Sequence, residues 1–501
     1  MLEQHDSIAQ HYHERTKYDP ETIASKSQGL DWSKQPVPFK EYKIGTTYDL
    51  KPYIEALKDD PVSIWWQRLS KLLFCSYGIT AKVPTMMGYP IYLRAAPSAG
   101  GLYPAEVYLI SRGTPILPAG LYSYQPQSHS LVHFWSSEVW QTLQAACFGH
   151  PALESTQIAL VITAVFYRSA WRYQDRAYRR IFLDTGHLLG NIELAGCLTD
   201  YRPHLIGGFI DSAVNELLYL DSDQEGSIAV IPLADLLDRQ QNIPSTQTAL
   251  PSATCCEYPQ IPDGELLRYC HQSTQIEAST SPLTSSQPPA EDKYNFPFCL
   301  KVPTTNYPID WEANLEELET TIINRRSTRG YSGGDLNLNE LLALLDFTYQ
   351  PEHYIDQGLN TPDYFDLNLV QTFIAVSGVM GLESGCYYYA PKSQELRQIR
   401  FKNFRPELHY LCLGQELGKD AAAVVFHTAD LKTAVAQYGD RVYRYLHMDA
   451  GHLGQRLNLA AIRLNLGVSG IGGFFDDQVN EVLGIPALEA VLYITTLGRP
   501  R

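Results

Sequence analysis

Residues 176–218 read RAYRRIFLDTGHLLGNIELAGCLTDYRPHLIGGFIDSAVNELL, and residues 441–483, 265 positions later, read RVYRYLHMDAGHLGQRLNLAAIRLNLGVSGIGGFFDDQVNEVL. The two stretches align without a gap, and 18 of their 43 positions carry the same amino acid. The same offset places GLYSYQP at residues 120–126 opposite GCYYYAP at residues 385–391. Self-similarity of this length at one spacing indicates two fused copies of a single domain.

The sequence between the copies differs in composition from both of them. It is rich in Ser, Thr, Pro and Gln, as in STQIEASTSPLTSSQPP, and such a segment buries too little apolar surface to fold alone. We therefore divide the chain into copy one, residues 1–240, a linker, residues 241–308, and copy two, residues 309–501. Apolar spacing in DTGHLLGNIELAGCL predicts a buried helix, whereas VYLIS, IALVITAVF and AVLYITTLG predict strands, so the fold class is α+β.

Composition restricts the kinds of partner that the chain can bind. The 501 residues carry a formal net charge of −16, so we expect no nucleic acid and no membrane surface as a partner. No apolar run of about 18 residues and no signal-peptide pattern occurs, which predicts a cytoplasmic protein. The nine cysteines include no C-x-x-C pair, so neither a disulfide framework nor a thiolate zinc site is expected.

Two short motifs contain the residues best suited to a ligand. LRAAPSAGGLYP, residues 93–104, combines the hydroxyl of Ser98 with Gly100 and Gly101, which allow a ligand to approach the backbone closely. A tight structural turn is the alternative interpretation. NRRSTRGY, residues 324–331, concentrates three arginines and a serine, and these groups suit a phosphate or a flavin carbonyl. A solvated basic turn is the alternative there.

Together these strings resemble the nitroreductase superfamily and, within it, the SagB/ThcOx branch of azoline oxidases. The resemblance rests on YHERTKYDP near the N-terminus, P-S-x-G-x-L-Y-P-x-E-V-Y, Y-G-D-R-x-Y-R-Y with D-A-G-H, and G-x-G-G-F. It covers both copies and implies that each is a three-layer α-β-α domain. It also implies that the copies pair as an intramolecular pseudo-dimer with FMN in their interface.

The resemblance further implies which residues hold the flavin. Copy two would supply ligands for the ribityl phosphate, a cation at the N1/O2 edge of the ring and a backbone N–H near N5. Arg325, Ser327 and Arg499, with the neighbouring Arg326, would bind the phosphate. Arg329 would be the cation at the N1/O2 edge, and Gly472 or Gly473 would supply the N–H near N5. Copy one would supply the loop on the other side of the flavin, namely Pro97, Ser98, Gly100, Gly101 and Leu102.

A second flavin site would need the loop from copy two and the arginine motif from copy one, but the loop of copy two lacks the small residues. The 265-position offset places Asp363 opposite Ser98, Phe365 opposite Gly100 and Asp366 opposite Gly101. Two carboxylates and a bulky ring would exclude an anionic flavin, and copy one has no R-R-S motif. We therefore predict one FMN per chain, and a monomer suffices because the dimer is internal.

The azoline oxidases are also associated with a catalytic Lys-Tyr pair just ahead of a G-x-R string, which is the G-D-R of residues 439–441 in copy two. Here the positions read Gln437-Tyr438 in copy two and Arg172-Tyr173 in copy one, so the lysine is absent from both. A phenol can donate a proton or a hydrogen bond, whereas glutamine exchanges no proton near neutral pH. We therefore predict that Tyr438 is the catalytic acid or base beside the complete flavin site.

An aspartate and a histidine recur three residues apart on the predicted helix of each copy, Asp184 with His187 and Asp449 with His452. Such a pair could ligate a metal, but its presence in both copies favours a structural role at a helix interface. We therefore predict no metal site. The N-terminal His11 and His13 are expected to lie in a solvated terminus.

These features predict an FMN-dependent oxidoreductase with ping-pong kinetics that acts on a small molecule or a peptide. Dehydrogenation of azoline rings in a modified peptide is one candidate reaction. An NAD(P)H-dependent nitro- or quinone reductase is an alternative, and a catalytically inactive scaffold or peptide-binding module is an alternative of a different class.

Overall fold

Two seven-stranded antiparallel sheets, one in each half of the chain, form the framework of the protein. The computed structural model describes residues 6–26, 29–54, 59–84, 90–244, 246–277, 291–297 and 299–501. In copy one the strand order is β1 (Thr46–Asp49), β6 (Ser130–Trp135), β5 (Gly120–Gln125), β4 (Ala105–Ser111), β7 (Ile158–Val165), β9 (Glu225–Asp235) and β8 (Tyr201–Pro203). In copy two it is β10 (Leu300–Pro303), β15 (Glu395–Arg400), β14 (Gly385–Ala390), β12 (Gln371–Val376), β16 (Ala423–Asp430), β18 (Glu489–Gly498) and β17 (Gly467–Ile471). The two orders correspond strand by strand, which confirms the predicted tandem α+β repeat.

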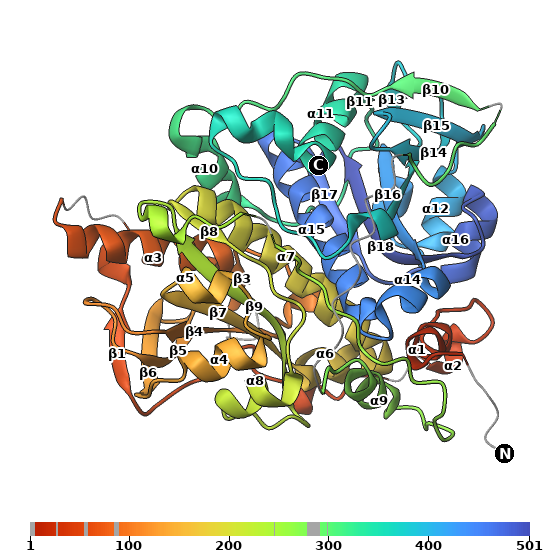
Figure 1. The fold of residues 1–501 in the computed structure, drawn as a ribbon. Helices are drawn as coiled ribbons and strands as arrows, with labels where there is room; N and C mark the ends of the chain where they lie inside the picture. The colour runs from red at the N-terminus through yellow and green to blue at the C-terminus, as the bar shows by residue number, and fades with distance from the viewer. Residues whose placement is uncertain are drawn as a thin grey trace.

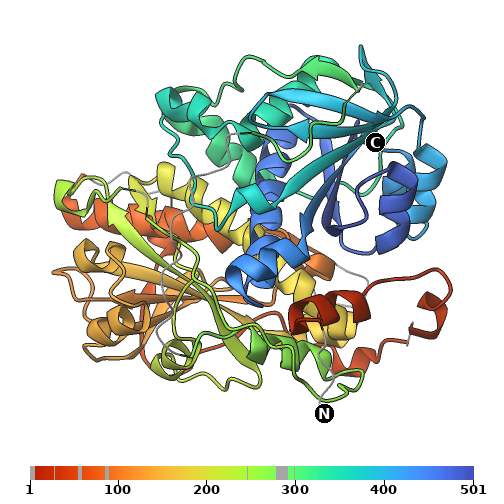
Figure 2. The same ribbon diagram turned by 45° about the vertical axis from the view of Figure 1, so that its right-hand side comes forward.

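Helices cover both faces of each sheet (Figures 1 and 2). The layer between the sheets contains α3 (Pro61–Tyr77), α7 (Ala177–Cys197), α11 (Leu338–Tyr349) and α15 (Val442–Arg463). The outer faces carry α4 (Trp140–Ala146), α5 (Ala152–Ser155) and α8 (Asp211–Leu217) in copy one, and α12 (Arg405–Leu411), α13 (Glu416–Lys419) and α16 (Asp476–Leu483) in copy two. The inner layer forms one continuous apolar core across both halves, and each outer layer has its own core. Each half is therefore a three-layer α-β-α domain, and the halves form the implied pseudo-dimer.

Shorter helices and strands lie between these elements. They are α2 (Ile23–Lys26), α6 (Phe166–Tyr173), α10 (Glu316–Asn324), α14 (Leu431–Tyr438), β2 (Ile79–Val83), β3 (Ile91–Arg94), β11 (Leu336–Asn337) and β13 (Val379–Met380). Within the described ranges, no helix is both long and apolar enough to span a membrane.

The two halves meet where α7 crosses α15, at the glycines of the two D-x-G-H motifs. A β-carbon on Gly186 would lie 2.2 Å from the carbonyl oxygen of Met448. A β-carbon on Gly451 would lie 2.3 Å from the carbonyl oxygen of Leu183. Backbone can approach backbone this closely only where a side chain is absent, so these two glycines set the distance between the halves.

Buried ion pairs across the same interface explain why R-x-Y-R and I-G-G-F-x-D recur in both copies. Asp211 of copy one binds Arg441 and Arg444 of copy two at 2.6 and 2.7 Å. The counterparts 265 positions away form the reciprocal pairs at 2.9 and 2.7 Å, Asp476 with Arg176 and Arg179. The matched residues are therefore those that join one half to the other.

The segment predicted as an unfolded linker is packed along residues 246–277, so that prediction is wrong for this part. Helix α9 (Leu266–Ser273) buries Leu266, Leu267 and Cys270 against the body of the protein, which supplies the apolar surface that the segment lacks alone. Most of the Ser/Thr/Pro-rich string, residues 278–290, lies outside the described residues.

Helix α9 occupies a position equivalent to that of the N-terminal helix α1 (Ile8–Arg15). Nε of Arg444 donates to the hydroxyl of Thr274 at 2.8 Å, and Nε of Arg179 donates to the hydroxyl of Thr16 at 3.0 Å. The expectation of a solvated N-terminus is also wrong, because α1 packs onto copy two and His13 is buried beside Tyr443. Figure 1 shows α1 and α9 next to each other at the lower edge of the molecule.

Candidate active site

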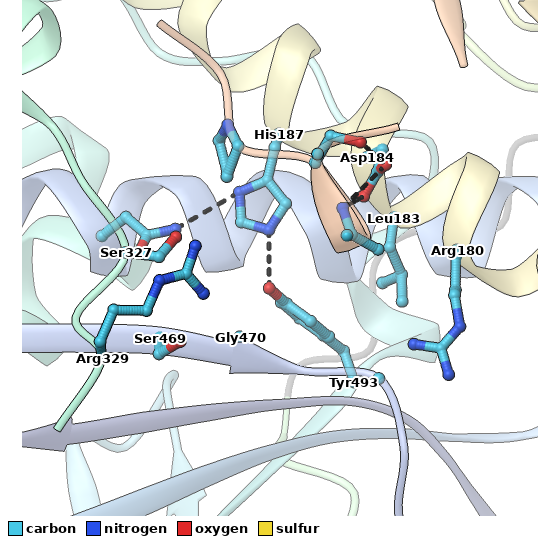
Figure 3. Close-up of a pocket in the computed structure, with 16 residues that line it drawn as sticks. Arg180, Leu183, Asp184, His187, Ser327, Arg329, Ser469, Gly470 and Tyr493 are labelled. Carbon is cyan, nitrogen blue, oxygen red and sulfur yellow. Dashed lines mark hydrogen bonds between the residues drawn. The ribbon is translucent and has the colours of Figure 1, made fainter. Parts of the chain in front are cut away.

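A pocket of about 160 Å³ lies between the two halves, beside the helix crossing (Figure 3). Copy one contributes a loop and one face of α7, and copy two contributes the segment after α10, part of α15, the end of β17 and the middle of β18. The lining residues are Pro97, Ser98, Ala99, Gly100, Gly101, Arg180, Leu183, Asp184, His187, Ser327, Arg329, Asn458, Ser469, Gly470, Gly472 and Tyr493. We call this pocket the open site.

The loop of the open site is held by the aspartate of the first D-x-G-H motif. The Ser98 hydroxyl donates to Asp184 Oδ2 at 2.6 Å, and the Ala99 N–H donates to the same carboxyl at 3.1 Å. Gly100 adopts a φ of +66°, which favours glycine, and a β-carbon there would lie 2.9 Å from the Tyr173 hydroxyl. The small residues of this motif are therefore required by backbone conformation and close packing.

Electrostatics distinguish the two polar residues of that motif. Burial raises the pKa of Asp184 to about 7, although the hydrogen bonds from Ser98 and Ala99 oppose the shift. Burial lowers the pKa of His187 to about 3, so its ring is neutral at neutral pH. The ring pairs with the Tyr493 hydroxyl at 2.8 Å (Figure 3). It also pairs with Gln455 at 2.9 Å, and both partners come from copy two.

The same motif in copy two has an equivalent structural function. Asp449 accepts the N–H groups of Phe365 and Asp366 at 3.0 and 2.9 Å, and burial raises its pKa to about 7. Each aspartate thus holds the corresponding loop of its own copy. Among the described residues, no group of three or more His, Cys, Asp or Glu side chains is arranged to hold a metal.

Copy two places three of its predicted ligands, Ser327, Arg329 and Gly472, in the pocket lining. Arg325 is buried behind them, and its Nε and Nη2 donate to the carbonyl oxygens of Ala95 and Arg94 at 2.7 and 3.1 Å. Its Nη1 has no hydrogen-bond partner within the described part of the chain. Burial lowers the pKa of Arg325 to about 10, so it remains a cation at neutral pH.

Four other predicted ligands do not line the pocket. Arg499 points away and forms an ion pair with Glu340 at 2.7 Å. Arg326 donates to the hydroxyl and the carbonyl oxygen of Thr80, which joins the two halves. Leu102 is buried in the core, and Gly473 lies just beyond the lining residue Gly472.

The structure also does not bring Tyr438 to the open site. Its hydroxyl donates to Asp366 Oδ2 at 3.0 Å, in the loop of copy two that corresponds to residues 97–101. The tyrosine beside the open site is Tyr173, because each tyrosine packs against the loop of its own copy. The expectation that Tyr438 accompanies the arginines of copy two is therefore corrected.

Several lining residues were not predicted as ligands, chiefly Arg180, Asn458, Ser469 and Tyr493. The sequence feature that could have identified such residues is a difference in amino acid between equivalent positions of the two copies, not an identity. Arg180 directly follows the matching R-x-Y-R string of copy one and stands opposite Tyr445 of copy two, so this third arginine is particular to copy one.

The position equivalent to the open site is filled by protein, and we call it the closed site. The ring of Phe365 stacks on that of Tyr445 with centroids 4.6 Å apart, and it packs against Gly207, the counterpart of Gly472. The Tyr445 hydroxyl donates to the carbonyl oxygens of Gly207 and Leu250 at 3.1 and 2.9 Å. Leu250, from the segment between the copies, therefore covers this position from outside.

The carboxylates of the closed site are occupied by protein groups. Asp363 pairs with Arg202 at 2.6 Å and accepts the Leu205 N–H at 3.1 Å. The remaining cavity there, lined in part by Asp363, Leu205 and His452, has a volume of about 20 Å³. The two equivalent positions are therefore unequal, one open and one filled.

A binding site built from both members of a pseudo-dimer is the feature that the fold and the pocket define. The family model described as "Nitroreductase family" matches residues 67–234 and 322–499, one region in each half. These regions cover more than half of the chain, which therefore belongs to the nitroreductase family, a family of oxidoreductases.

Three relatives illustrate the range of similarity. A crystal structure of an Anabaena variabilis ATCC 29413 protein, provisionally named a nitroreductase, is 74% identical with a TM-score of 0.96, and the match covers 99% of this chain and 100% of that chain. MJ1384 of Methanocaldococcus jannaschii, also provisionally named a nitroreductase, is 32% identical over 189 residues, 37% of this chain and 93% of the relative. The microcin B17-processing protein McbC of Escherichia coli is 29% identical over 151 residues, 29% of this chain and 55% of McbC.

Proposed function

We propose that the chain is a flavin-dependent oxidoreductase that binds one FMN in the open site. The observation that carries this proposal is the inequality of the two equivalent positions, about 160 Å³ against about 20 Å³. The donor set of the open site fits an anionic flavin, since Arg329 lines it and the buried Nη1 of Arg325 has no partner among the described residues. The closed site instead presents Asp363 and the ring of Phe365.

In this proposal the open site divides the cofactor between the two copies. Arg325 and Ser327 would hold the phosphate, Arg329 would provide a cation for the polar edge of the ring, and the backbone of Gly472 would provide an N–H for its centre. Residues 97–101 of copy one cover the opposite side. Arg499 is not among the phosphate ligands, because Glu340 already neutralises it. When bound, FMN supplies reversible two-electron redox chemistry.

Tyr173 is the proposed proton donor or acceptor of the open site. Its ring lies under the guanidinium of Arg180 at 3.8 Å, and Arg172, which stands in the lysine position of the Lys-Tyr pair, lies at 5.7 Å. Burial raises the pKa of Tyr173, while Arg180 and Arg172 oppose the shift. The Tyr173 hydroxyl is therefore protonated at neutral pH and can donate its proton to a bound substrate.

The proposed reaction is a ping-pong exchange in which a donor and an acceptor use the same pocket in turn. Similarity to McbC, a protein that processes microcin B17, supports a peptide substrate and the azoline oxidase branch. An NAD(P)H-dependent nitro- or quinone reductase is the second candidate, supported by the provisional names of the other two relatives. Rapid anaerobic bleaching of the flavin by NAD(P)H would select the reductase. An open pocket beside the buried Nη1 of Arg325, which has no partner among the described residues, argues against an inactive scaffold.

The flavin site is tested by giving the open site the residues of the closed site. Tyr493 and Ala229 occupy equivalent positions in the strand registers of the two sheets. The 265-position offset makes Leu205 the counterpart of Gly470. A β-carbon on Gly470 would lie 1.9 Å from the Tyr493 hydroxyl, so the two changes must be made together. The variant Gly470→Leu/Tyr493→Ala is expected to retain its fold and to bind less than about a tenth of the FMN of the wild type.

Leu205→Ile provides the control, because it alters the same position of the closed site and conserves volume. It is expected to keep the flavin content of the wild type, measured by absorbance after heat release. Unchanged flavin in Gly470→Leu/Tyr493→Ala would place the flavin elsewhere and refute the proposal.

A further inference from the structure

Arg180 is a buried cation of the open site that forms no direct ion pair with any of the described residues. It is 7% exposed, and a β-carbon on Gly472 would lie 2.2 Å from its Nη1. Among the described residues, no carboxylate lies within 4.0 Å of its guanidinium, and its Nε has no hydrogen-bond partner. A buried guanidinium in this state has an unmet requirement for an anion.

The neighbours of Arg180 show that this lack of a partner is particular to it. Arg176 and Arg179, on the same turn of chain, both bind Asp476. Asp184, one turn further along α7, is already engaged by Ser98 and Ala99. Among the described residues, carboxylates therefore contact the structural arginines directly, whereas Asp184 interacts with the arginine that faces the pocket only at longer range.

The closed site shows that the fold does not require a cation at this position. Tyr445 is the counterpart of Arg180, and its hydroxyl is satisfied by two carbonyl oxygens. The cation is present only where the pocket is open. The function of Arg180 is therefore to interact with a ligand that enters the open site.

The two cations that line the open site have separate positions. In the view of Figure 3, Arg329 and Arg180 lie on opposite sides of the pocket, with His187 and Tyr493 between them. Arg329 follows Ser327 in the motif that we propose for the flavin. Arg180 instead lies over Tyr173, the proposed proton donor, at 3.8 Å.

We infer that Arg180 binds a carboxylate of the substrate and thereby places the substrate between Tyr173 and the flavin. The planar fork of a guanidinium can donate two parallel hydrogen bonds to a carboxylate, which gives both affinity and orientation. This inference rests on the proposed function and narrows its substrate class to molecules with a carboxylate near the reacting group.

The test uses the purified full-length chain and two probes of the same shape, benzoate and benzamide, whose binding is measured by calorimetry. Wild type is expected to bind benzoate at least about tenfold more tightly than benzamide. Arg180→Tyr, which introduces the residue that copy two accommodates, should weaken benzoate binding about ten- to a hundredfold and leave benzamide binding unchanged. Arg180→Gln gives a second variant with the same expectation. Arg239→Gln, at an exposed arginine of copy one, is the control for net charge.

Three outcomes would overturn the inference. These are equal binding of benzoate and benzamide by the wild type, unchanged benzoate binding by both Arg180 variants, or loss of FMN from those variants, which would assign Arg180 to the cofactor. Calorimetry does not depend on flavin colour. A wild-type chain without flavin would therefore refute the proposed function separately from the result for Arg180.

Discussion

Replacing Asp476 with asparagine is expected to lower the free energy of unfolding by about 3–5 kcal/mol, the usual effect of removing one partner of a buried ion pair. Asp476 binds Arg176 and Arg179 at 2.9 and 2.7 Å, and all three side chains are buried in the interface between the halves. Without the carboxylate charge, two guanidinium groups stay buried against a neutral amide. Equilibrium denaturation in urea, followed by tryptophan fluorescence, measures the change.

The neighbouring Asp477 supplies a matched control for this prediction. Its exposed carboxylate binds Lys17 at 2.7 Å, and exposed pairs contribute about 0–1 kcal/mol. Asp477→Asn should therefore change the unfolding free energy by less than about 1 kcal/mol. Asp211→Asn, which breaks the reciprocal pair, should destabilise the protein as strongly as Asp476→Asn. Small and similar effects of all three changes would show that these pairs do not hold the halves together.

Replacing Tyr173 with phenylalanine is expected to slow the substrate-dependent turnover of the flavin on the order of a hundredfold, with FMN still bound. The Tyr173 hydroxyl lies against Gly100 of the open site, and phenylalanine keeps the ring that Arg180 covers. The change thus removes the proton donor and preserves the packing. Stopped-flow absorbance, with menadione as the oxidant of the reduced protein, measures the rate.

Tyr438→Phe is the matched control, since the repeat places Tyr438 at the equivalent position. Its hydroxyl donates to Asp366 beside the closed site, and it is expected to turn over at the rate of the wild type. A slow Tyr438→Phe protein together with a Tyr173→Phe protein of normal rate would reverse the assignment made from the structure.

Sequence comparison of the two copies predicted the fold well because the matched positions are those that join the halves. Gly186 and Gly451 meet at the helix crossing, and the repeated arginines and aspartates pair across it. Helix α9 was missed for a different reason. Its likeness to α1 is short, limited to residues such as Thr16 and Thr274, and a composition rich in Ser, Thr and Pro surrounds it.

The candidate site was predictable only in part. The substitution of Phe365 for a glycine correctly indicated a blocked position, since that ring fills the closed site. The tyrosine was assigned to the wrong position because sequence order does not show which copy supplies which side of an interface pocket. Arg180 was overlooked because the comparison favoured positions that both copies share, whereas its importance lies in its difference from Tyr445.

The central claim is that two equivalent positions carry one working flavin site. The most direct measurement is the amount of FMN released from the purified chain, quantified by absorbance against protein concentration from amino-acid analysis. The account predicts saturation at one FMN per chain, because Phe365 and Asp363 occupy the second position. Saturation at two FMN per chain, or a chain that binds none under any loading condition, would contradict it.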